Sequence, residues 1–339
     1  MTTALEPTAK EPAPAGAPTL ITRVWQYVRY RPSAFAVVLV VVLLLANVIV
    51  SPAFLGSSQI APTLGTLAPF AIAGMASTPA FLSGRGGIDL SIAPLMGFTN
   101  ILLVTKLFGT VLGGPEFAVP ILLAIGAAIG AVNGVMIARL RIPPVIATLG
   151  TYFVLSGVDL RLVPNPVSAG PNWTDNLAGS IGPVPGALLT VGAPLLLWWA
   201  LRRSPYVDSL LSVGDHDATA FSAGMSVDRV RISAYALGGM VAGIGGIALA
   251  GLVRSADAQV FSDYVLVALA AVALGGTNLA GGRGGMLLSA IGAASIFLLE
   301  NLLTSLHASA YFIQVAYGGV LFFAVLLGAR LMRGETTSP

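Results

Sequence analysis

Long runs of apolar residues, separated by short polar or glycine-rich breaks, fill the chain from about residue 33 almost to its C-terminal end. A helix that crosses a membrane needs roughly 20 such residues, and fewer where other helices shelter it. The pattern predicts an all-α integral membrane protein with about ten transmembrane helices, some of them broken. The second and third runs could form one kinked unit, and the eighth is rich in glycine. The expected ranges are 33–50, 60–82, 88–106, 118–138, 143–163, 185–201, 230–253, 263–281, 285–306 and 311–332.

A polar segment from Leu211 to Arg231 stands between two of these runs. This segment is too short to form a domain, and its pattern is too regular for an irregular loop. Asp215 is placed to cap a short helix over residues 216–222, and Gly224 is placed to end that helix. We therefore predict a structured loop over residues 204–229, which another protein could grip.

The side chains of this short helix indicate how a partner would bind it. Ala218 and Phe221 stand three residues apart and would form one apolar stripe. An exposed helix with such a stripe fits a groove on another protein. His216 lies between Asp215 and Asp217, but a metal site would need more ligands than these, so a solvated turn is the better interpretation and no metal site is expected.

The arginines test the number of spans, because basic residues are enriched in the cytoplasmic loops of membrane proteins. With about ten spans and a cytoplasmic N-terminus, only Lys106, Arg161 and Arg254 fall on the outer side. The residues on the cytoplasmic side are Arg23, Arg29, Arg31, Arg85, Arg139, Arg141, Arg202, Arg203, Arg229, Arg231, Arg283, Arg330 and Arg333. We therefore expect both termini and the polar segment to be cytoplasmic.

The composition supports a position in the lipid bilayer. Only 9% of the residues are charged, whereas a soluble globular protein carries about 25%. The absence of cysteine excludes disulfides and thiolate metal sites, and the net charge of +3 gives no reason to expect a nucleic-acid partner. We expect a disordered cytoplasmic tail over 1–32, a transmembrane domain over 33–333 that contains the cytoplasmic loop 204–229, and a short C-terminal tail over 334–339.

Two similar strings suggest an internal repeat. The string Gly-Arg-Gly-Gly begins at Gly84 and again at Gly282, and Leu-Ser follows at the same distance in both cases. Both strings stand at expected cytoplasmic bends, which would make a parallel repeat of the kind found in transporters. A rival register aligns GGIDLS at Gly86 with GGTNLA at Gly275, so the register stays open.

Signatures of common enzymes are absent from the sequence. It contains no HExxH zinc motif, no GxSxG elbow and no GxxxxGK[ST] phosphate loop. The chain is therefore not expected to be an enzyme, nor to bind ATP by the usual loop.

Acidic residues bear on the energy source for transport. A charge at the centre of the bilayer costs about 2.5–3.5 kcal/mol on insertion scales, so ion-coupled transporters keep one there for a purpose. Here Glu300 is the nearest to a span centre, yet it lies towards the outer end. The acidic residues at expected span ends are Glu116, Asp159, Asp175, Asp257 and Asp263. An ion-gradient-driven secondary transporter that acts alone remains the alternative function, and an intramembrane enzyme is a third.

Four polar residues within or near the spans are candidates for the substrate path: Asp89, Asn100, Asn133 and Asn301. For Asp89 the favoured interpretation is structural, because its carboxylate can accept the free amide protons of a first helical turn. Buried amides such as the three asparagines form hydrogen bonds between helices at least as often as they bind substrate.

Several strings together resemble the permease subunits of bacterial ribose-type (monosaccharide) ABC importers. They cover most of the chain beyond about residue 60: GGIDLS from Gly86, NGVMIARLRIPPVIATLGT from Asn133, GMSVDRVRI from Gly224, ALAAVALGGTNLAGGRGG from Ala268 and QVAYGGVLFFAVLL from Gln314. The fairly specific motif positions are Gly86, Gly87, Asp89, Gly275, Gly276, Asn278, Gly281 and Gly282.

The resemblance implies a translocation subunit in the bacterial inner membrane for a monosaccharide or small polyol. It also implies three kinds of partner: a cytoplasmic ABC ATPase dimer that holds ATP and Mg²⁺, a periplasmic sugar-binding protein, and a second permease copy or a related permease. This chain itself is expected to carry no cofactor.

The resemblance also assigns the polar segment as the loop that couples to the ATPase. The implied coupling residues are Gly214, Asp215, His216, Asp217, Ala218, Thr219, Ala220, Phe221 and Gly224. In the family this loop typically reads like GGNEEAARLSGI. Asp215, Ala218 and Phe221 depart from that pattern, which could mean that the functional unit contains a second, different permease.

Overall fold

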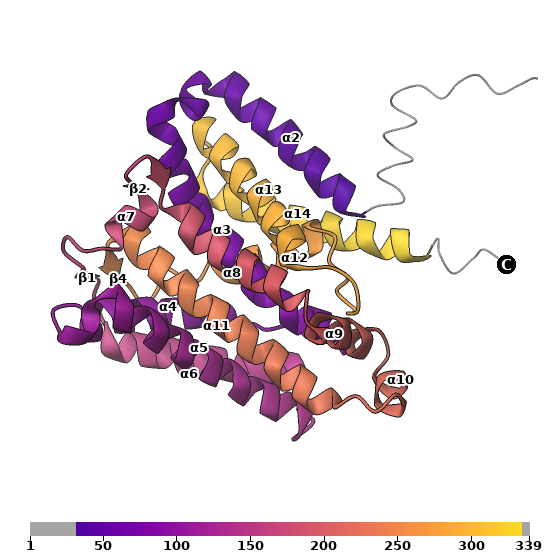
Figure 1. The fold of residues 1–339 in the computed structure, drawn as a ribbon. Helices are drawn as coiled ribbons and strands as arrows, with labels where there is room; N and C mark the ends of the chain where they lie inside the picture. The colour runs from indigo at the N-terminus through magenta and orange to yellow at the C-terminus, as the bar shows by residue number, and fades with distance from the viewer. Residues whose placement is uncertain (1–31, 334–339) are drawn as a thin grey trace, which may run out of the picture.

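The apolar runs form helices in the computed structural model, which describes residues 32–333 (Figure 1). The expected tails, 1–32 and 334–339, lie outside this range except for Pro32. The long and medium helices are α2 (Pro32–Val50), α3 (Ser57–Leu82), α4 (Ile92–Leu102), α5 (Pro115–Ala138), α6 (Pro144–Leu162), α8 (Ala187–Leu201), α11 (Val227–Val253), α12 (Tyr264–Leu274), α13 (Met286–Ser305) and α14 (Ala310–Arg333).

Short elements connect these helices. They are the 3₁₀-helices η1 (Pro52–Leu55) and η3 (Val111–Gly113), the π-helix η2 (Leu103–Leu107), the helices α7 (Asp175–Ala178), α9 (Pro205–Asp215) and α10 (Asp217–Ser222), and four two-residue strands. Strand β1 (Val167–Ser168) pairs antiparallel with β4 (Ser255–Ala256), and β2 (Ser180–Ile181) pairs antiparallel with β3 (Val184–Pro185). The all-α fold class is confirmed.

Five helices among the described residues are long and apolar enough to cross a membrane: α3, α5, α6, α11 and α13. Shorter apolar helices cover 34–50, 92–107, 187–201 and 264–274. Length and composition therefore support a multi-pass membrane protein, but they give fewer clear spans than the expected number of about ten.

Two expected ranges differ from the helices that form. The range 263–281 is wrong in its second half, because α12 ends at Leu274 and Gly276 then adopts a left-handed φ of 79°. The range 88–106 is wrong at its start, since α4 begins only at Ile92 and a loop over 83–91 separates it from α3. Helix α4 continues without a gap into the π-helix η2.

Helices α3 and α11 form the centre of the molecule and are the most buried of the long helices. Helix α3 packs against α8, α11, α12 and α13, and α11 packs against α3, α4 and α5. Polar side chains join neighbouring helices inside this core. Thr78 on α3 donates a 2.7 Å hydrogen bond to Ser289 on α13, and Asn47 on α2 donates one of 2.8 Å to the carbonyl of Leu298. Such bonds hold helices together in a membrane, where the hydrophobic effect does not favour contact with protein over contact with lipid.

The two ends of the bundle carry different structures (Figure 1). One end carries the strands and α7, where Trp173 donates a 2.8 Å hydrogen bond to the carbonyl of Gly113 and packs edge-on against Phe108. The opposite end carries α9 and α10. Helices α3 and α11 run antiparallel between the two ends, because Ser83 meets Arg231 at one end, whereas Gly65 lies against α7 and Gly251 against Thr174 at the other.

Candidate functional site

The polar segment folds as two helices, α9 and α10, at one end of the bundle. Helix α9 begins where the Ser204 hydroxyl accepts the amide of Tyr206 at 3.3 Å, with Pro205 in the first turn. Its buried side chains, Val207, Leu210 and Val213, recur every three residues and face the bundle. This spacing gives α9 one apolar face, so it lies on the bundle and holds α10 beside it.

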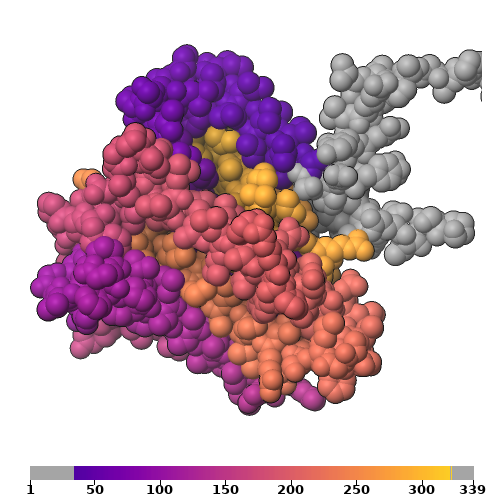
Figure 2. All heavy atoms as spheres, viewed as in Figure 1, coloured from indigo at the N-terminus to yellow at the C-terminus, as the bar shows by residue number. Residues whose placement is uncertain are grey.

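Helix α10 has an exposed outer face and a buried inner one. Ala220 is buried against the bundle, whereas Phe221 exposes 72% of its surface and Ala218 and Thr219 are also exposed. Figure 2 places the salmon-coloured atoms of this region at the edge of the molecule. An aromatic side chain so exposed at the tip of a helix is the pattern of a surface that receives a partner.

The start of α10 differs from the sequence-based expectation. The prediction that Asp215 caps this helix is wrong, because Asp215 is the last residue of α9 and His216 occupies the N-cap position. The backbone amide of His216 bonds to the carbonyl of Ser212, so this residue also ends α9. The expected end is confirmed: α10 stops at Ser222, and Gly224 follows with a left-handed φ of 83°.

Asp217 fixes α10 to the bundle through two arginines. Its carboxylate forms an ion pair with Arg85, from the loop after α3, and accepts a 2.8 Å hydrogen bond from Arg231 on α11. Arg231 also donates to the carbonyl of Ser83 at 3.1 Å. The Arg231 side chain is only 3% exposed, whereas that of Arg85 is 64% exposed. The inner ion pair is therefore the strong one, because solvent screens the outer pair.

Both glycine-rich strings meet the elbow between α9 and α10. The amide of Gly282 donates to the carbonyl of Leu82 at 3.3 Å, which links the two loops. A Cβ atom on Gly281 would lie 2.6 Å from the Gly214 carbonyl oxygen and 2.6 Å from the Cα of Gly84, and Gly281 has a φ of 109°. Only glycine fits where backbone approaches backbone this closely. The elbow, Gly214 and Asp215 at the end of α9, is therefore in direct contact with the loop after α3 and the loop before α13.

The remaining motif residues shape these two loops. Asn278 donates to the Gly281 carbonyl at 2.9 Å, and its side-chain oxygen accepts the amide of Ala280 at 3.0 Å. Gly86 and Gly276 have left-handed φ angles. Gly275 and Gly87 also lie against backbone, of Leu288 and of Ala80 respectively. These motif residues therefore shape the two glycine-rich loops, of which Gly281 and Gly282 touch α9 at Gly214 and Asp215.

Two of the four substrate-path candidates belong to one hydrogen-bond network. The Asp89 carboxylate accepts the amide and the hydroxyl of Ser91, at 2.9 and 2.6 Å. Asn133 donates to the Ser91 hydroxyl at 2.8 Å and accepts from Thr151 at 2.5 Å. Asp89 lies in the loop before α4, outside the membrane-spanning helices, where burial raises its pKa to about 6 while the Ser91 hydrogen bonds lower it. The prediction that Asp89 caps the helix is therefore wrong: Ser91 is the N-cap residue of α4, and the Asp89 carboxylate closes the turn that leads into it.

The other two candidates lie apart from this network. Asn100 donates a 3.2 Å hydrogen bond to the carbonyl of Ser255, at the end that carries the strands. Asn301 is half-buried on α13. The structure therefore does not bring the four candidates together.

Sequence reasoning missed the partners that anchor α10 and the polar network. None of the four residues Arg85, Arg231, Ser91 and Thr151 was singled out as a partner of Asp217, Asp89 or Asn133, although all four stand within the quoted strings. Ser91 lies within the GGIDLS string, so the motif itself pointed to it. No sequence signal joined Asp217 to Arg85, because the two residues belong to different helix connections.

Comparisons with known proteins agree on one class of protein. Residues 59–329 match the family described as "Branched-chain amino acid transport system / permease component". The chain is similar to the ribose import permease protein RbsC of Bacillus subtilis, with 33% identity over 82% of this chain and 87% of that protein. It is also similar to RbsC of Escherichia coli strain K12, with 34% identity over 71% and 77%. The autoinducer 2 import system permease protein LsrC of Klebsiella pneumoniae is 33% identical over 61% of both chains. No solved structure matches.

Proposed function

The chain belongs to the branched-chain amino acid transport system permease family, and from this premise we propose that it is the translocation subunit of an ATP-driven ABC importer for a monosaccharide or small polyol. ATP and Mg²⁺ bind to separate ATPase subunits, a periplasmic binding protein delivers the substrate, and a second permease copy or a related permease completes the pathway. The relatives named for ribose import support the class of substrate.

One observation carries the coupling role: α10 presents the exposed Phe221 side chain while Asp217 ties the same helix to the bundle. A helix that is held firmly on one side and open on the other can transmit a partner's movement. We assign Gly214, Asp215, His216, Asp217, Ala218, Thr219, Ala220, Phe221 and Gly224 to this coupling segment. Movement of the ATPase subunits would shift the elbow and the two glycine-rich loops beneath it, and so favour one state of the bundle over another.

We place α9 and α10 on the cytoplasmic side, with ten membrane-crossing helices, α2, α3, α4 with η2, α5, α6, α8, α11, α12, α13 and α14, and both termini cytoplasmic. The distribution of arginines supports this orientation. Arg85 and Arg231 lie at the α10 end, whereas Arg254 lies at the other end, 3.2 Å from Asp175. Arginines are retained on the cytoplasmic side during insertion.

The proposal is tested by co-purification in mild detergent with the genes of a candidate ATPase and binding protein expressed together. We expect an ATPase subunit to co-purify, with an ATPase rate that rises with the sugar-loaded binding protein. Phe221→Asp should abolish ATPase association while the permease still folds, because it places a charge on the contact surface. Ser222→Asp, on the same helix and also exposed, is the matched control. Unchanged assembly with Phe221→Asp contradicts the coupling role.

An ion-driven transporter that acts alone is the second candidate, and one observation favours it. Asp159 on α6 is fully buried, and neither of its carboxylate oxygens has a hydrogen-bond partner among the described residues. A buried carboxylate in a membrane helix is a candidate for ion coupling. Uptake by the purified chain alone, driven by a proton or sodium gradient without ATP, would establish this alternative and reject the importer.

A further inference from the structure

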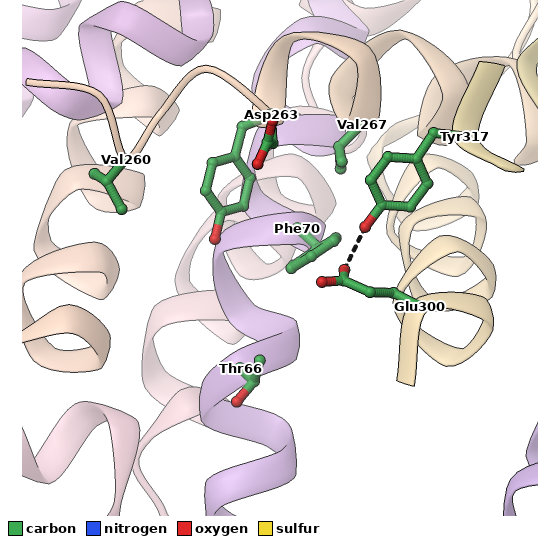
Figure 3. A pocket seen from close by; sticks show the side chains of 8 residues that line it. Thr66, Phe70, Val260, Asp263, Val267, Glu300 and Tyr317 are labelled. Atoms are coloured by element: carbon green, nitrogen blue, oxygen red, sulfur yellow. Dashed lines mark hydrogen bonds between the residues drawn. The ribbon is translucent and has the colours of Figure 1, made fainter. Parts of the chain in front are cut away.

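A cavity of about 190 Å³ lies between α3, α12, α13 and α14 and the loop before α12 (Figure 3). Its lining residues are Thr66, Phe70, Val260, Asp263, Tyr264, Val267, Glu300 and Tyr317. Asp263 and Thr66 are exposed, so the cavity opens to the surface of the molecule. The coupling segment contributes no residue to its lining. None of these residues was among the candidates for the substrate path.

The cavity has one rigid aromatic wall. The Phe70 ring packs edge-on against the rings of Tyr264 and Phe297, with centroid distances of 5.3 and 5.9 Å. Such mutually packed rings hold each other in place. A preformed apolar surface of this kind suits the C–H face of a sugar ring, which can stack on it without displacing protein atoms.

Polar atoms stand opposite and beside this wall. The Tyr317 hydroxyl donates to one carboxylate oxygen of Glu300, as Figure 3 shows, and the other oxygen is left to accept a further hydrogen bond. Among the described residues, the Tyr264 hydroxyl has no recorded hydrogen-bond partner. Asp263 is the N-cap residue of α12 but makes no capping bond with its side chain, so its carboxylate is also open. These atoms are acceptors, or in Tyr264 a donor as well, and they suit a ligand with several hydroxyl groups.

The charge of the lining limits the class of ligand. It includes two carboxylates and no lysine, arginine or histidine. An anionic ligand would be repelled, and a zwitterionic amino acid would find no cation for its carboxylate. The N-terminal end of α12 is a poor substitute for such a cation, because the negative charge of the nearby Asp263 side chain opposes the binding of a carboxylate there even though it makes no capping bond. The volume is also below the roughly 300–1,000 Å³ of sites for drug-sized ligands.

We propose that this cavity binds a neutral polyhydroxyl molecule of monosaccharide size, with the sugar ring against Phe70 and hydroxyl groups on Tyr264, Glu300 and Asp263. The inference rests on the proposed transport function and assigns one substrate-binding site along the transport path to residues of this chain. It also favours sugars over amino acids for this member of the family.

The test uses the absence of cysteine from the chain. In Thr66→Cys the single thiol lines the cavity, and its alkylation by N-ethylmaleimide is followed in the full-length permease in nanodiscs. Thr66 is a suitable site because it is exposed and its hydroxyl is already bonded to the carbonyl of Pro62. We expect D-ribose at about ten times its Kd to slow alkylation about tenfold, by simple occupancy. L-isoleucine should give no protection.

Two hydroxyl deletions in the Thr66→Cys background form a matched pair. Tyr264→Phe should raise the ribose concentration for half-protection about fivefold, as expected for one lost hydrogen bond. Tyr235→Phe is the control, because the Tyr235 hydroxyl is buried without a partner among the described residues and does not line the cavity. It should leave protection unchanged. Ser222→Cys, on α10, should react at the same rate with and without ribose.

Equal alkylation of Thr66→Cys with and without ribose and xylitol would overturn the proposal. Equal effects of Tyr264→Phe and Tyr235→Phe, or protection by 1,4-diaminobutane or isoleucine but not by ribose, would also overturn it. The assay needs no ATPase, so its outcome is separate from that of the importer. ATP-driven sugar uptake without protection rejects only this cavity, whereas protection without a co-purifying ATPase rejects only the importer.

Discussion

The Asp217 carboxylate forms ion pairs with two arginines that differ in their exposure to solvent. Arg231 is buried and reaches both Asp217 and the Ser83 carbonyl, whereas Arg85 approaches from the surface. A buried charge that loses its partner costs far more than an exposed one, because water cannot replace the lost interaction. The attachment of α10 to the bundle therefore depends mainly on the inner pair.

Asp217→Asn should lower the stability of the folded permease by about 3 kcal/mol, because it leaves the Arg231 charge buried without a counter-ion. Arg85→Gln removes only the exposed pair and should cost less than about 1 kcal/mol. Thermal unfolding midpoints of the two variants in the same detergent compare these effects. Equal midpoints would show that the inner pair has no special weight.

At the scale of elements, α5 and α11 pack through glycines. Gly126, Gly130 and Gly134 recur every four residues along α5 and lie against the backbone of α11 near Gly239, Tyr235 and Ile232. This spacing places all three on one face of α5. Helices in a membrane associate closely through such small residues, since direct backbone contact increases van der Waals attraction. The interface sets the position of α11, and hence of Arg231 at its start.

Gly130→Ala should destabilise the permease by about 1–3 kcal/mol, the usual cost of overpacking. The added methyl group would meet the Tyr235 backbone and lie 3.2 Å from the Cα of Ala236, and backbone atoms cannot turn aside. Gly150→Ala on α6 is the control, because no atom lies within 4 Å of a Cβ at that position. There the alanine should be neutral or stabilising by up to about 1 kcal/mol. Similar unfolding midpoints for the two variants would argue against close packing at Gly130.

At the scale of the whole molecule, the two ends of the bundle carry different structures, and we propose different roles for them. One end carries the coupling segment and the linked glycine-rich loops, and the other carries the strands, α7 and the ion pair between Arg254 and Asp175. The proposed sugar cavity contains no residue of either glycine-rich loop. In the proposed function, substrate binding and ATPase coupling would therefore use separate surfaces joined by α3 and α13, whose contact includes the hydrogen bond between Thr78 and Ser289.

The proposed orientation predicts opposite labelling of two single-cysteine variants. Ser222→Cys on α10 should react with a membrane-impermeant maleimide only in inside-out vesicles. Ser168→Cys on the exposed strand β1 should react only in right-side-out spheroplasts. Because the parent chain has no cysteine, each signal comes from one site. Labelling of both variants from the same side would contradict the two-ended arrangement, and reversal of both would invert the orientation.

The sequence predicted the positions of most helices and the short exposed helix of the coupling segment. Both depend on local features: runs of apolar residues, and polar or glycine residues that end them. The errors arose where one local sequence signal was compatible with more than one structure. Asp215 could cap a helix, but α9 continued through it, and the glycine-rich region after Leu274 was apolar enough to be counted as helix.

The amino-acid sequence by itself determined that this chain is a helical membrane protein, that Phe221 stands on an exposed helix, and that the chain resembles sugar-importer permeases. These are properties of composition and of neighbouring residues, which do not depend on how distant segments cross. Only the tertiary structure decided that Arg85 and Arg231 share Asp217, that the two glycine-rich loops touch the same elbow, and that Phe70, Tyr264 and Glu300 line one cavity. Each of these contacts joins residues from different helices or loops, so it follows from which helices pack together rather than from any local pattern.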